Sequence, residues 1–406
     1  MIILYSFFIQ LYAWAIRITG LFSQKAKLLA KGQNSSFAIL SEKISDKNRY
    51  IWVHAASLGE FEQGRPIIEA IKKEQPEYKI VLTFFSPSGY EIRKNYSMAD
   101  VICYLPMDKK SNAKKFIKLI KPEKAIFIKY EFWANYLLTL KKNNIPTYIV
   151  SAIFREKQLF FKSYAGWYRN LLTCFSHIFV QDKHSKELLD KFNIKNVTVS
   201  GDTRFDRVTN IASNSKELPL IESFKGGNQV IVAGSSWEPD ETLLFEYFNN
   251  NDVKLIIAPH ETQPERIKSI LRKTNKNVAL YSEQDKQKFE SADCLIIDCI
   301  GILSSIYKYA DIAYIGGGFG VGIRNGVEAA VYGTPVIFGP NYARFKEAND
   351  LVNRQGGFSI QNCEELTVLL NRFLTEKNFL AETSKKASVY IKENVGATEL
   401  FMRNIF

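Results

Sequence analysis

IGGGFGVGIRNGVE, residues 315–328, is the most informative stretch of this 406-residue chain. Five of the seven residues 316–322 are glycine, and a sixth glycine follows at position 326. Glycine loses more backbone entropy on folding than any other residue, so such a run indicates that something must approach the backbone closely. An apolar run at 311–315 precedes the glycines and a helical pattern begins near Asn325, which together predict a strand, a tight turn and a helix.

This glycine turn does not match the common phosphate-binding motifs. The dinucleotide fingerprint requires glycines at positions n, n+2 and n+5; counted from 316, 318 or 320, the last position holds Val321, Ile323 or Asn325. The chain also contains no GxxxxGK[ST] motif, which excludes a P-loop hydrolase. A helix N-terminus with free N–H groups remains as an anion site. Glu328, one turn in, either accepts hydrogen bonds from two ribose hydroxyls or is only a partner of the helix dipole.

Outward from this turn, short apolar runs alternate with helical patterns along most of the chain. This alternation predicts an α/β fold made of parallel sheets that are covered on both faces. A chain of this length favours two such doubly wound domains, with ligands beyond the carboxyl ends of the strands and a cleft between the domains. The strand-like runs lie at 50–57, 78–86, 124–130, 146–153, 177–182, 230–236, 253–259, 293–298, 311–317 and 334–340.

Composition shifts divide the chain into five segments. We expect an N-terminal membrane-associating segment (1–31), a first Rossmann-like domain (32–208), a polar linker (209–229) and a second Rossmann-like domain (230–385). A C-terminal helix (386–406) follows, and it is expected to pack back on the N-terminal domain.

The chain is strongly basic, with 54 Lys and Arg against 42 Asp and Glu and a net charge of +12. This excess suits a phosphate-rich partner, nucleic acid or an anionic membrane, although solvated surface lysines would also produce it. No nucleic-acid-binding module is recognisable, so no nucleic acid partner is expected. The five cysteines lie mainly in apolar runs, which indicates reduced thiols, and their spacing beside four scattered histidines predicts no metal site.

Residues 1–22, MIILYSFFIQLYAWAIRITGLF, are almost entirely apolar up to Arg17 and lack the features of a cleaved signal peptide. Sixteen residues before the first charge are at the short limit for a spanning helix, which needs about 20. The aromatic residues and the lysines that follow suit a membrane interface with anionic headgroups. We expect an interfacial helix or a short anchor; the alternative is a helix docked on its own domain.

A second informative stretch is HAASLGEFEQGRP, residues 54–66, where a strand ends in small residues and a helix begins. Glu60 lies at this strand-to-helix turn. As a helix-capping acid it would have a lowered pKa and be a weak base. In a desolvated site, within reach of a substrate hydroxyl, it would instead serve as a general base. Position alone leaves both roles open.

Six motifs occur in the order in which they are found in a known family: WVHAASLGE (52–60), YEFWANY (130–136), SGDTRFD (200–206), GSSWEPDE (234–241), IAPHE (257–261) and the block 316–340. The chain thereby resembles the 3-deoxy-D-manno-octulosonic acid (Kdo) transferases of lipopolysaccharide synthesis, in a form similar to the Bacteroidetes branch. The resemblance implies a GT-B glycosyltransferase with CMP-Kdo as donor, a lipid A precursor as acceptor and no cofactor. It also implies a location at the cytoplasmic side of the inner membrane.

The resemblance assigns roles residue by residue. Glu60 matches the family's catalytic base, Glu328 the ribose-binding Glu and Asn325 the Asn before it. Arg324 stands where the family usually has His, and His260 where Arg is typical, so the chain departs from the family pattern at these two donor positions. The implied donor-binding residues are Ser235, Ser236, Pro259, His260, Gly317, Gly318, Arg324, Asn325 and Glu328; candidate substrate contacts are Lys129, Glu131, Arg155, Arg204 and Asp206.

The implied mechanism is a metal-free single displacement that inverts the anomeric centre, with the phosphate of CMP as the leaving group. One alternative is a GT-B enzyme that uses another nucleotide sugar, or an epimerase of the same fold. A second alternative is a membrane-associated binding protein without catalytic activity. The sequence leaves open how many Kdo units are transferred, which acylation pattern the acceptor has, and the oligomeric state.

Overall fold

The computed structural model describes residues 1–320 and 322–406, which form two compact units. The first unit contains residues 1–207 and 395–406, and the second contains residues 208–394. The chain passes between them within α9 (Thr203–Ser213), and again between α18 (Lys377–Asn394) and α19 (Ala397–Ile405). Each unit is described separately below.

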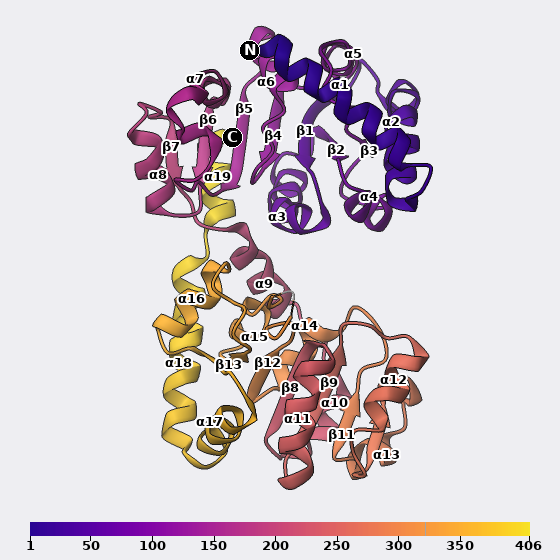
Figure 1. Ribbon diagram of the computed structural model, residues 1–406, viewed down its shortest axis with the longest axis vertical. Coiled ribbons are helices and arrows are strands. Elements are labelled where there is room, and N and C mark those ends of the chain that lie inside the picture. Colours follow the sequence, from indigo (N-terminus) through magenta and orange to yellow (C-terminus); the bar gives the residue numbers. More distant parts are fainter. Residues whose placement is uncertain (321) are drawn as a thin grey trace. The chain divides into compact units, whose positions relative to one another are not determined.

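The first unit is built on a seven-stranded sheet in the order β3-β2-β1-β4-β5-β6-β7, in which all pairs are parallel (Figure 1). The strands are β1 (Arg49–Ala55), β2 (Tyr78–Phe84), β3 (Val101–Tyr104), β4 (Lys124–Ile128), β5 (Thr147–Ala152), β6 (His177–Val180) and β7 (Val197–Val199). The helices of this unit, besides α9 and α19, are α1 (Ile2–Thr19), α2 (Gln24–Lys43), α3 (Leu58–Glu74), α4 (Pro87–Arg93), α5 (Lys110–Ile120), α6 (Ala134–Lys142), α7 (Gly166–Arg169) and α8 (Lys183–Asp190).

Both faces of this sheet are buried, as a parallel sheet requires. Successive side chains of a strand point to opposite faces, so Trp52 of β1 packs with Phe116 of α5 and Tyr136 of α6. Its neighbours Ile51 and Val53 belong to a separate core cluster that includes residues of α3 and α19. The apolar run of β1 is long because the strand contributes side chains to two hydrophobic cores, one on each face of the sheet.

The second unit repeats this architecture, with the strand order β10-β11-β9-β8-β12-β13-β14 and parallel pairing throughout. Its strands are β8 (Val230–Ser236), β9 (Lys254–Pro259), β10 (Val278–Leu280), β11 (Cys294–Ile296), β12 (Ile312–Ile315), β13 (Val336–Phe338) and β14 (Gly357–Ser359). Its helices are α10 (Pro219–Lys225), α11 (Glu238–Asn250), α12 (Pro264–Leu271), α13 (Lys286–Ser291), α14 (Leu303–Ile306), α15 (Val327–Ala330), α16 (Lys346–Asn353), α17 (Cys363–Thr375) and α18. The prediction of two doubly wound α/β units is confirmed.

The segment 209–229, predicted as a linker, lies inside the second unit and is largely helical. Helix α10 buries Ile221 and Phe224 completely. These side chains, together with the ion pair of Lys225 with Asp311, attach the segment to the second unit, and the linker prediction was wrong for this reason.

Helix α1 has one face on the first unit and one face exposed. The Tyr5 hydroxyl donates to the buried Asp108 carboxylate at 2.6 Å, and Ile9 and Ile16 are buried. Most of the other large apolar side chains of α1, including Phe7, Phe8 and Trp14, remain exposed. Within the described residues, Ile2–Thr19 is the one helix long and apolar enough to cross a membrane, although length and composition alone are weak evidence.

Asp206 fixes the C-terminal helix α19 to the first unit. Its Oδ1 accepts from the N–H of Gly396, and its Oδ2 accepts from both the N–H and the hydroxyl of Thr398, all at 2.6 Å. Both oxygens therefore serve the N-terminus of a helix that lies 190 residues away in the sequence. These contacts give Asp206 a structural role, and its predicted contact with substrate stays a prediction.

We expect Asp206→Ala to lower the free energy of unfolding of the first unit by about 1–3 kcal/mol, because the N-terminus of α19 loses its acceptor. Urea unfolding and hydrogen exchange of the α19 amides measure the effect. Asp46→Ala is the control, since Asp46 forms an exposed ion pair with Lys121. Equal stability and equal α19 protection in the two variants would contradict this role.

Candidate functional site

In the first unit the candidate residues follow the two central strands β1 and β4. These strands are neighbours, yet the chain leaves β1 toward β2 on one side and returns to β4 on the other. In a doubly wound sheet, ligands bind beyond the carboxyl ends at such a point of reversal. Glu60 follows β1 and Glu131 follows β4, so both carboxylates lie at this edge.

Glu60 lies in the first turn of α3 and closes a capping box. Its Oε2 accepts from the N–H of Ser57 at 3.2 Å, while its own N–H donates to the Ser57 hydroxyl at 3.5 Å. The capping role considered for this residue is therefore present in the structure. It does not exclude a second role, because a carboxylate has about four acceptor positions and the capping bond occupies one of them.

The environment of Glu60 raises its pKa, so its carboxylate is a stronger base than that of an ordinary helix-capping acid. Burial raises its pKa, and the nearby carboxylate of Glu131 raises it further, to about 7. Backbone hydrogen bonds with Ala56 and Ser57 and the charge of Lys129 act in the opposite direction but are outweighed. Of the two alternatives left open by the sequence, a lowered pKa from the helix N-terminus and a raised pKa from desolvation, the second applies, because desolvation dominates. A carboxylate with a pKa near 7 is well matched to general-base catalysis at neutral pH.

Glu131 lies against two ring nitrogens, one of Trp133 and one of His54. Trp133 Nε1 donates to its Oε2 at 2.5 Å, and His54 Nε2 lies 3.1 Å from the same oxygen. His54 is completely buried, and its Nδ1 lies 2.9 Å from the hydroxyl of Thr83. In the tautomer protonated on Nε2, His54 accepts from Thr83 and donates to Glu131. These partners fix the carboxylate that raises the pKa of Glu60.

Two of the candidate cations, Arg155 and Arg204, lie near the phenol of Tyr130. Burial raises the pKa of Tyr130; the charges of Arg155 and Arg204 lower it, and those of Glu60 and Asp202 raise it. All four charged groups therefore act on one phenol. Lys129, in the left-handed region at φ 68°, is the residue before it. The structure thus brings together five of the six residues predicted for this unit; Asp206 is the exception.

Arg204 is oriented by a buried acid that sequence reasoning missed. Asp202 accepts from Arg204 Nε at 2.9 Å, and from Gln63 of α3 at 3.0 and 3.1 Å. Burial alone would raise the pKa of Asp202, but the Arg204 charge and these hydrogen bonds lower it overall. Gln63 lies one helical turn after Glu60, so the first turn of α3 and the SGDTRFD segment are locked together.

In the second unit the corresponding reversal lies between β8 and β12. Gly316 follows β12, and a Cβ there would come within 2.3 Å of the Ser235 carbonyl oxygen. Gly317 has a φ of +92°, and a Cβ on Gly318 would collide with the backbone of Gly339. The glycine run indicated that something approaches its backbone closely. At Gly316 and Gly318, what approaches is the backbone of neighbouring segments of the same unit, at Ser235 and Gly339.

Asp240, which was also missed, anchors this turn. Its Oδ2 accepts from the N–H groups of Gly317 and Trp237, both at 2.9 Å, and its Oδ1 accepts from the Tyr314 hydroxyl at 3.0 Å. Burial raises the pKa of Asp240, although these hydrogen bonds oppose the shift. Asp240 lies within the GSSWEPDE motif, in the first turn of the helix that follows β8. An acid at such a strand-to-helix turn could have been predicted from the sequence to accept backbone N–H groups there.

The two serines at the end of β8 differ in their surroundings. Ser236 is buried and its hydroxyl donates to Glu241 at 2.9 Å, which favours a structural role for this predicted donor contact. Ser235 is partly exposed and has a left-handed φ of +54°. A non-glycine residue held in that region is strained, and such strain is concentrated at functional sites.

His260 and Arg324, the two positions that depart from the family pattern, are in contact with each other. The Arg324 guanidinium lies 3.1 Å from His260 Nε2, and the His260 ring stacks on Trp237 at 4.5 Å. Burial and then the Arg324 charge lower the pKa of His260. Its backbone N–H, just after Pro259, donates to the Ser236 carbonyl at 2.9 Å. The exposed Arg324 thus supplies a cation beside a neutral ring.

Glu328 is positioned by two donors on its own unit. Asn325 Nδ2 donates to its Oε1 at 2.9 Å, and the Ser304 hydroxyl donates to its Oε2 at 3.0 Å. A carboxylate has about four acceptor positions, so this geometry leaves capacity for a ligand's hydroxyls. Asn325 Oδ1 is buried without a hydrogen-bond partner among the described residues. Asn325 and Glu328 are therefore brought together as the sequence predicts.

Two parallel, doubly wound units of this kind define the class of GT-B proteins, and solved structures agree. A UDP-GlcNAc 2-epimerase from Neisseria meningitidis, bound to UDP-GlcNAc, matches with a TM-score of 0.61 and 15% identity, over 87% of this chain and 98% of that one. A glycosyltransferase from Rickettsia africae matches with a TM-score of 0.56 and 12% identity, over 88% and 97%. At such low identity the likeness shows the fold alone.

Sequence comparison is more specific. Residues 31–207 match the family of 3-deoxy-D-manno-octulosonic-acid transferases (Kdo transferases). A Kdo transferase from Aquifex aeolicus is 27% identical over 357 residues, which is 86% of this chain and 92% of that protein. The resemblance seen in the motifs is confirmed: this chain is similar to Kdo transferases over most of its length. The Bacteroidetes-like branch stays a prediction.

The raised pKa of Glu60 predicts how stability depends on pH. Between about pH 4.5 and 7 the unfolded state ionises Glu60 while the folded state keeps it protonated, so stability is lost as the pH rises. Glu60→Gln removes this penalty. Wild type should therefore lose about 1–3 kcal/mol relative to Glu60→Gln between pH 4 and pH 8, measured by urea unfolding. Glu74→Gln, at the exposed far end of α3, is the control; the same pH dependence in both variants would refute the shift.

Proposed function

We propose that this glycosyltransferase moves Kdo from CMP-Kdo to a lipid A precursor, in an inverting single displacement at the cytoplasmic face of the inner membrane. The similarity to Kdo transferases supports the sugar class. The observation that carries the proposed reaction is the pKa of Glu60, because a carboxylate near pKa 7 takes up a hydroxyl proton at neutral pH.

In this proposal Glu60 accepts the proton from the acceptor's primary hydroxyl as that oxygen bonds to the anomeric carbon. The bond to the phosphate of CMP breaks at the same time, and the configuration at that carbon inverts. Lys129, Arg155 and Arg204 are placed to meet the anionic groups of the substrates, since all three lie near Tyr130 or Glu60. Because the donor is already activated and its leaving group is one phosphate, the step needs no metal.

The donor side is assigned to the second unit. Glu328 would accept hydrogen bonds from the ribose hydroxyls, and Arg324 would meet the phosphate or the Kdo carboxylate, which a planar guanidinium binds with two N–H groups. The exposed position of Arg324 and the fixed geometry of Glu328 support these roles. The exposed apolar face of α1 supports membrane association of the first unit.

The reaction and its base are tested together. Wild-type protein with CMP-Kdo and a tetra-acyl lipid A precursor should give a product heavier by Kdo, read by mass spectrometry. Glu60→Gln should bind both substrates but lose about 10²–10⁴-fold in turnover, the amount a positioned base supplies. Glu74→Gln should retain wild-type turnover. Near-normal turnover of folded Glu60→Gln would move the base to another residue, with Glu131 tested next; the absence of product from wild type would reject the substrates.

Glu328→Gln should weaken binding of CMP by about 1–3 kcal/mol, because a hydrogen-bonded carboxylate is replaced by a neutral amide. Isothermal titration calorimetry measures the affinity, and thermal unfolding checks that the unit remains folded. Glu364→Gln is the matched control, since Glu364 is an exposed acid in the first turn of α17 in the same unit. Unchanged CMP affinity in Glu328→Gln would remove this residue from the donor site.

A further inference from the structure

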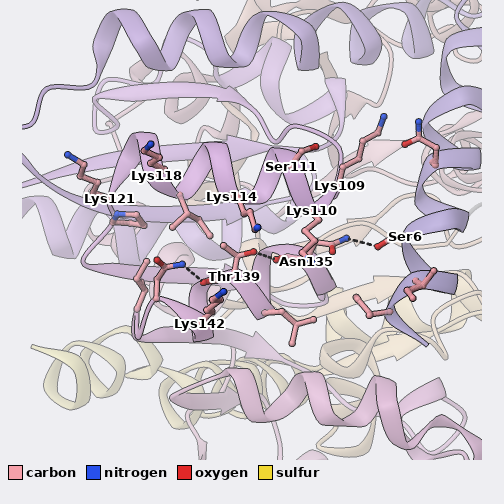
Figure 2. Close-up of a pocket in the computed structure, with 18 residues that line it drawn as sticks. Ser6, Lys109, Lys110, Ser111, Lys114, Lys118, Lys121, Asn135, Thr139 and Lys142 are labelled. Atoms are coloured by element: carbon pink, nitrogen blue, oxygen red, sulfur yellow. Dashed lines mark hydrogen bonds between the residues drawn. The ribbon is translucent and has the colours of Figure 1, made fainter.

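A groove of about 1240 Å³ lies on the first unit (Figure 2). One wall is α5, the other includes α6, and the N-terminal half of α1 contributes Ile2, Ile3, Ser6 and Gln10. Asn135 of α6 donates to Ser6 at 3.5 Å, which joins α1 to the groove. Among the described residues, no candidate for proton transfer or donor binding lines it.

The polar lining of this groove is strongly cationic. Six lysines reach it, and Figure 2 shows those of α5 across from Lys142 of α6; they are Lys109, Lys110, Lys114, Lys118, Lys121 and Lys142. Lys121 pairs with Asp46, and no other member of this set forms an ion pair within the described part of the chain. No Asp or Glu appears among the described residues that line the groove. The site therefore concentrates positive charge, which within the described part of the chain is offset by one ion pair, at Lys121.

This arrangement of lysines does not by itself stabilise the first unit. Lys110, Lys114 and Lys118 are spaced four apart, so they lie along one side of α5, where like charges repel each other. Lys110 also stands at the helix N-terminus, whose partial positive charge disfavours a cation. An anion bound between α5 and α6 would relieve both effects.

The lining also has an apolar part, which continues onto α1. Ile2, Ile3, Leu138 and Ile145 contribute hydrophobic surface to the groove. Beyond Ile3, the exposed face of α1 carries further apolar side chains; they are Leu4, Phe7, Phe8, Leu11 and Trp14. A ligand that uses all of this surface has a negatively charged head and hydrocarbon chains.

We propose that this groove binds the phosphate headgroup of an anionic membrane phospholipid, with the acyl chains along the exposed face of α1. The lipid is a bound ligand of the bilayer and not the acceptor of the sugar. A free phosphate or a nucleic acid would satisfy the lysines but leave the isoleucines and the apolar face of α1 in water. The inference does not depend on the transfer reaction, because lipid binding is measured without turnover.

The full-length protein is mixed with vesicles of phosphatidylcholine alone or with 30% phosphatidylglycerol, and binding is read by cosedimentation. Replacing Lys110, Lys114 and Lys118 together by Gln should reduce partitioning onto the phosphatidylglycerol vesicles about 100-fold, since each lysine near such a surface contributes about 1 kcal/mol, or about fivefold. Replacing the exposed Lys377, Lys385 and Lys392 of α18 by Gln removes the same charge and should have little effect. Equal binding of the groove variant and wild type, or an equal loss in the α18 variant, would overturn the proposal.

Two further measurements separate the sources of the anion. Dihexanoyl phosphatidylglycerol, below its micelle concentration, should bind wild type saturably and the groove variant at least tenfold more weakly, while glycerol phosphate should not bind detectably. Equal binding of glycerol phosphate would make this a phosphate site only and overturn the lipid assignment. In phospholipid-free detergent the groove variant should keep the wild-type KM for the lipid acceptor. A tenfold higher KM would assign the groove to the acceptor and overturn the proposal.

Discussion

The constraint on which the structure depends is that both sheets are entirely parallel. Parallel neighbours cannot be joined by a tight turn, so each connection must cross over a face of the sheet. Each chain segment starts with a central strand, β1 or β8, builds outward to one edge and returns to the other side. At the return, the connections diverge to opposite faces and leave the carboxyl ends of the central strands uncovered. Glu60 follows β1, Glu131 follows the neighbouring β4, and Gly317 follows β12, the neighbour of β8.

Both units stabilise these exposed turns with a buried carboxylate. In the first unit Asp202 links Gln63 of α3 to Arg204, and in the second Asp240 links Tyr314 to the glycine turn. A loop that carries ligand groups cannot be held by hydrophobic burial, because its side chains must remain accessible. A buried acid that accepts several hydrogen bonds beneath the loop fixes it instead.

The sequence was sufficient for the features that depend on local pattern. Alternating apolar and helical runs predicted both sheets, and a strand followed by small residues placed Glu60 and Glu328 near strand ends. Features set by distant partners could not be predicted. Asp206 shares a motif with Arg204, but its partners Gly396 and Thr398 come from the opposite end of the chain. The raised pKa of Glu60 likewise depends on Glu131, which arrives with another strand.

The return of α19 to the first unit has a consequence for biosynthesis. Residues 395–406 are part of that unit, and residues 208–394 are made before them. At roughly 5–20 residues per second, the ribosome needs about 10–40 s to complete the intervening unit. During this interval the surface of α3 that will receive Phe401 is exposed, and Asp206 has not yet met the helix it caps. A nascent chain in this state is a substrate for chaperones, and a chain that stops before residue 395 can never finish its first domain.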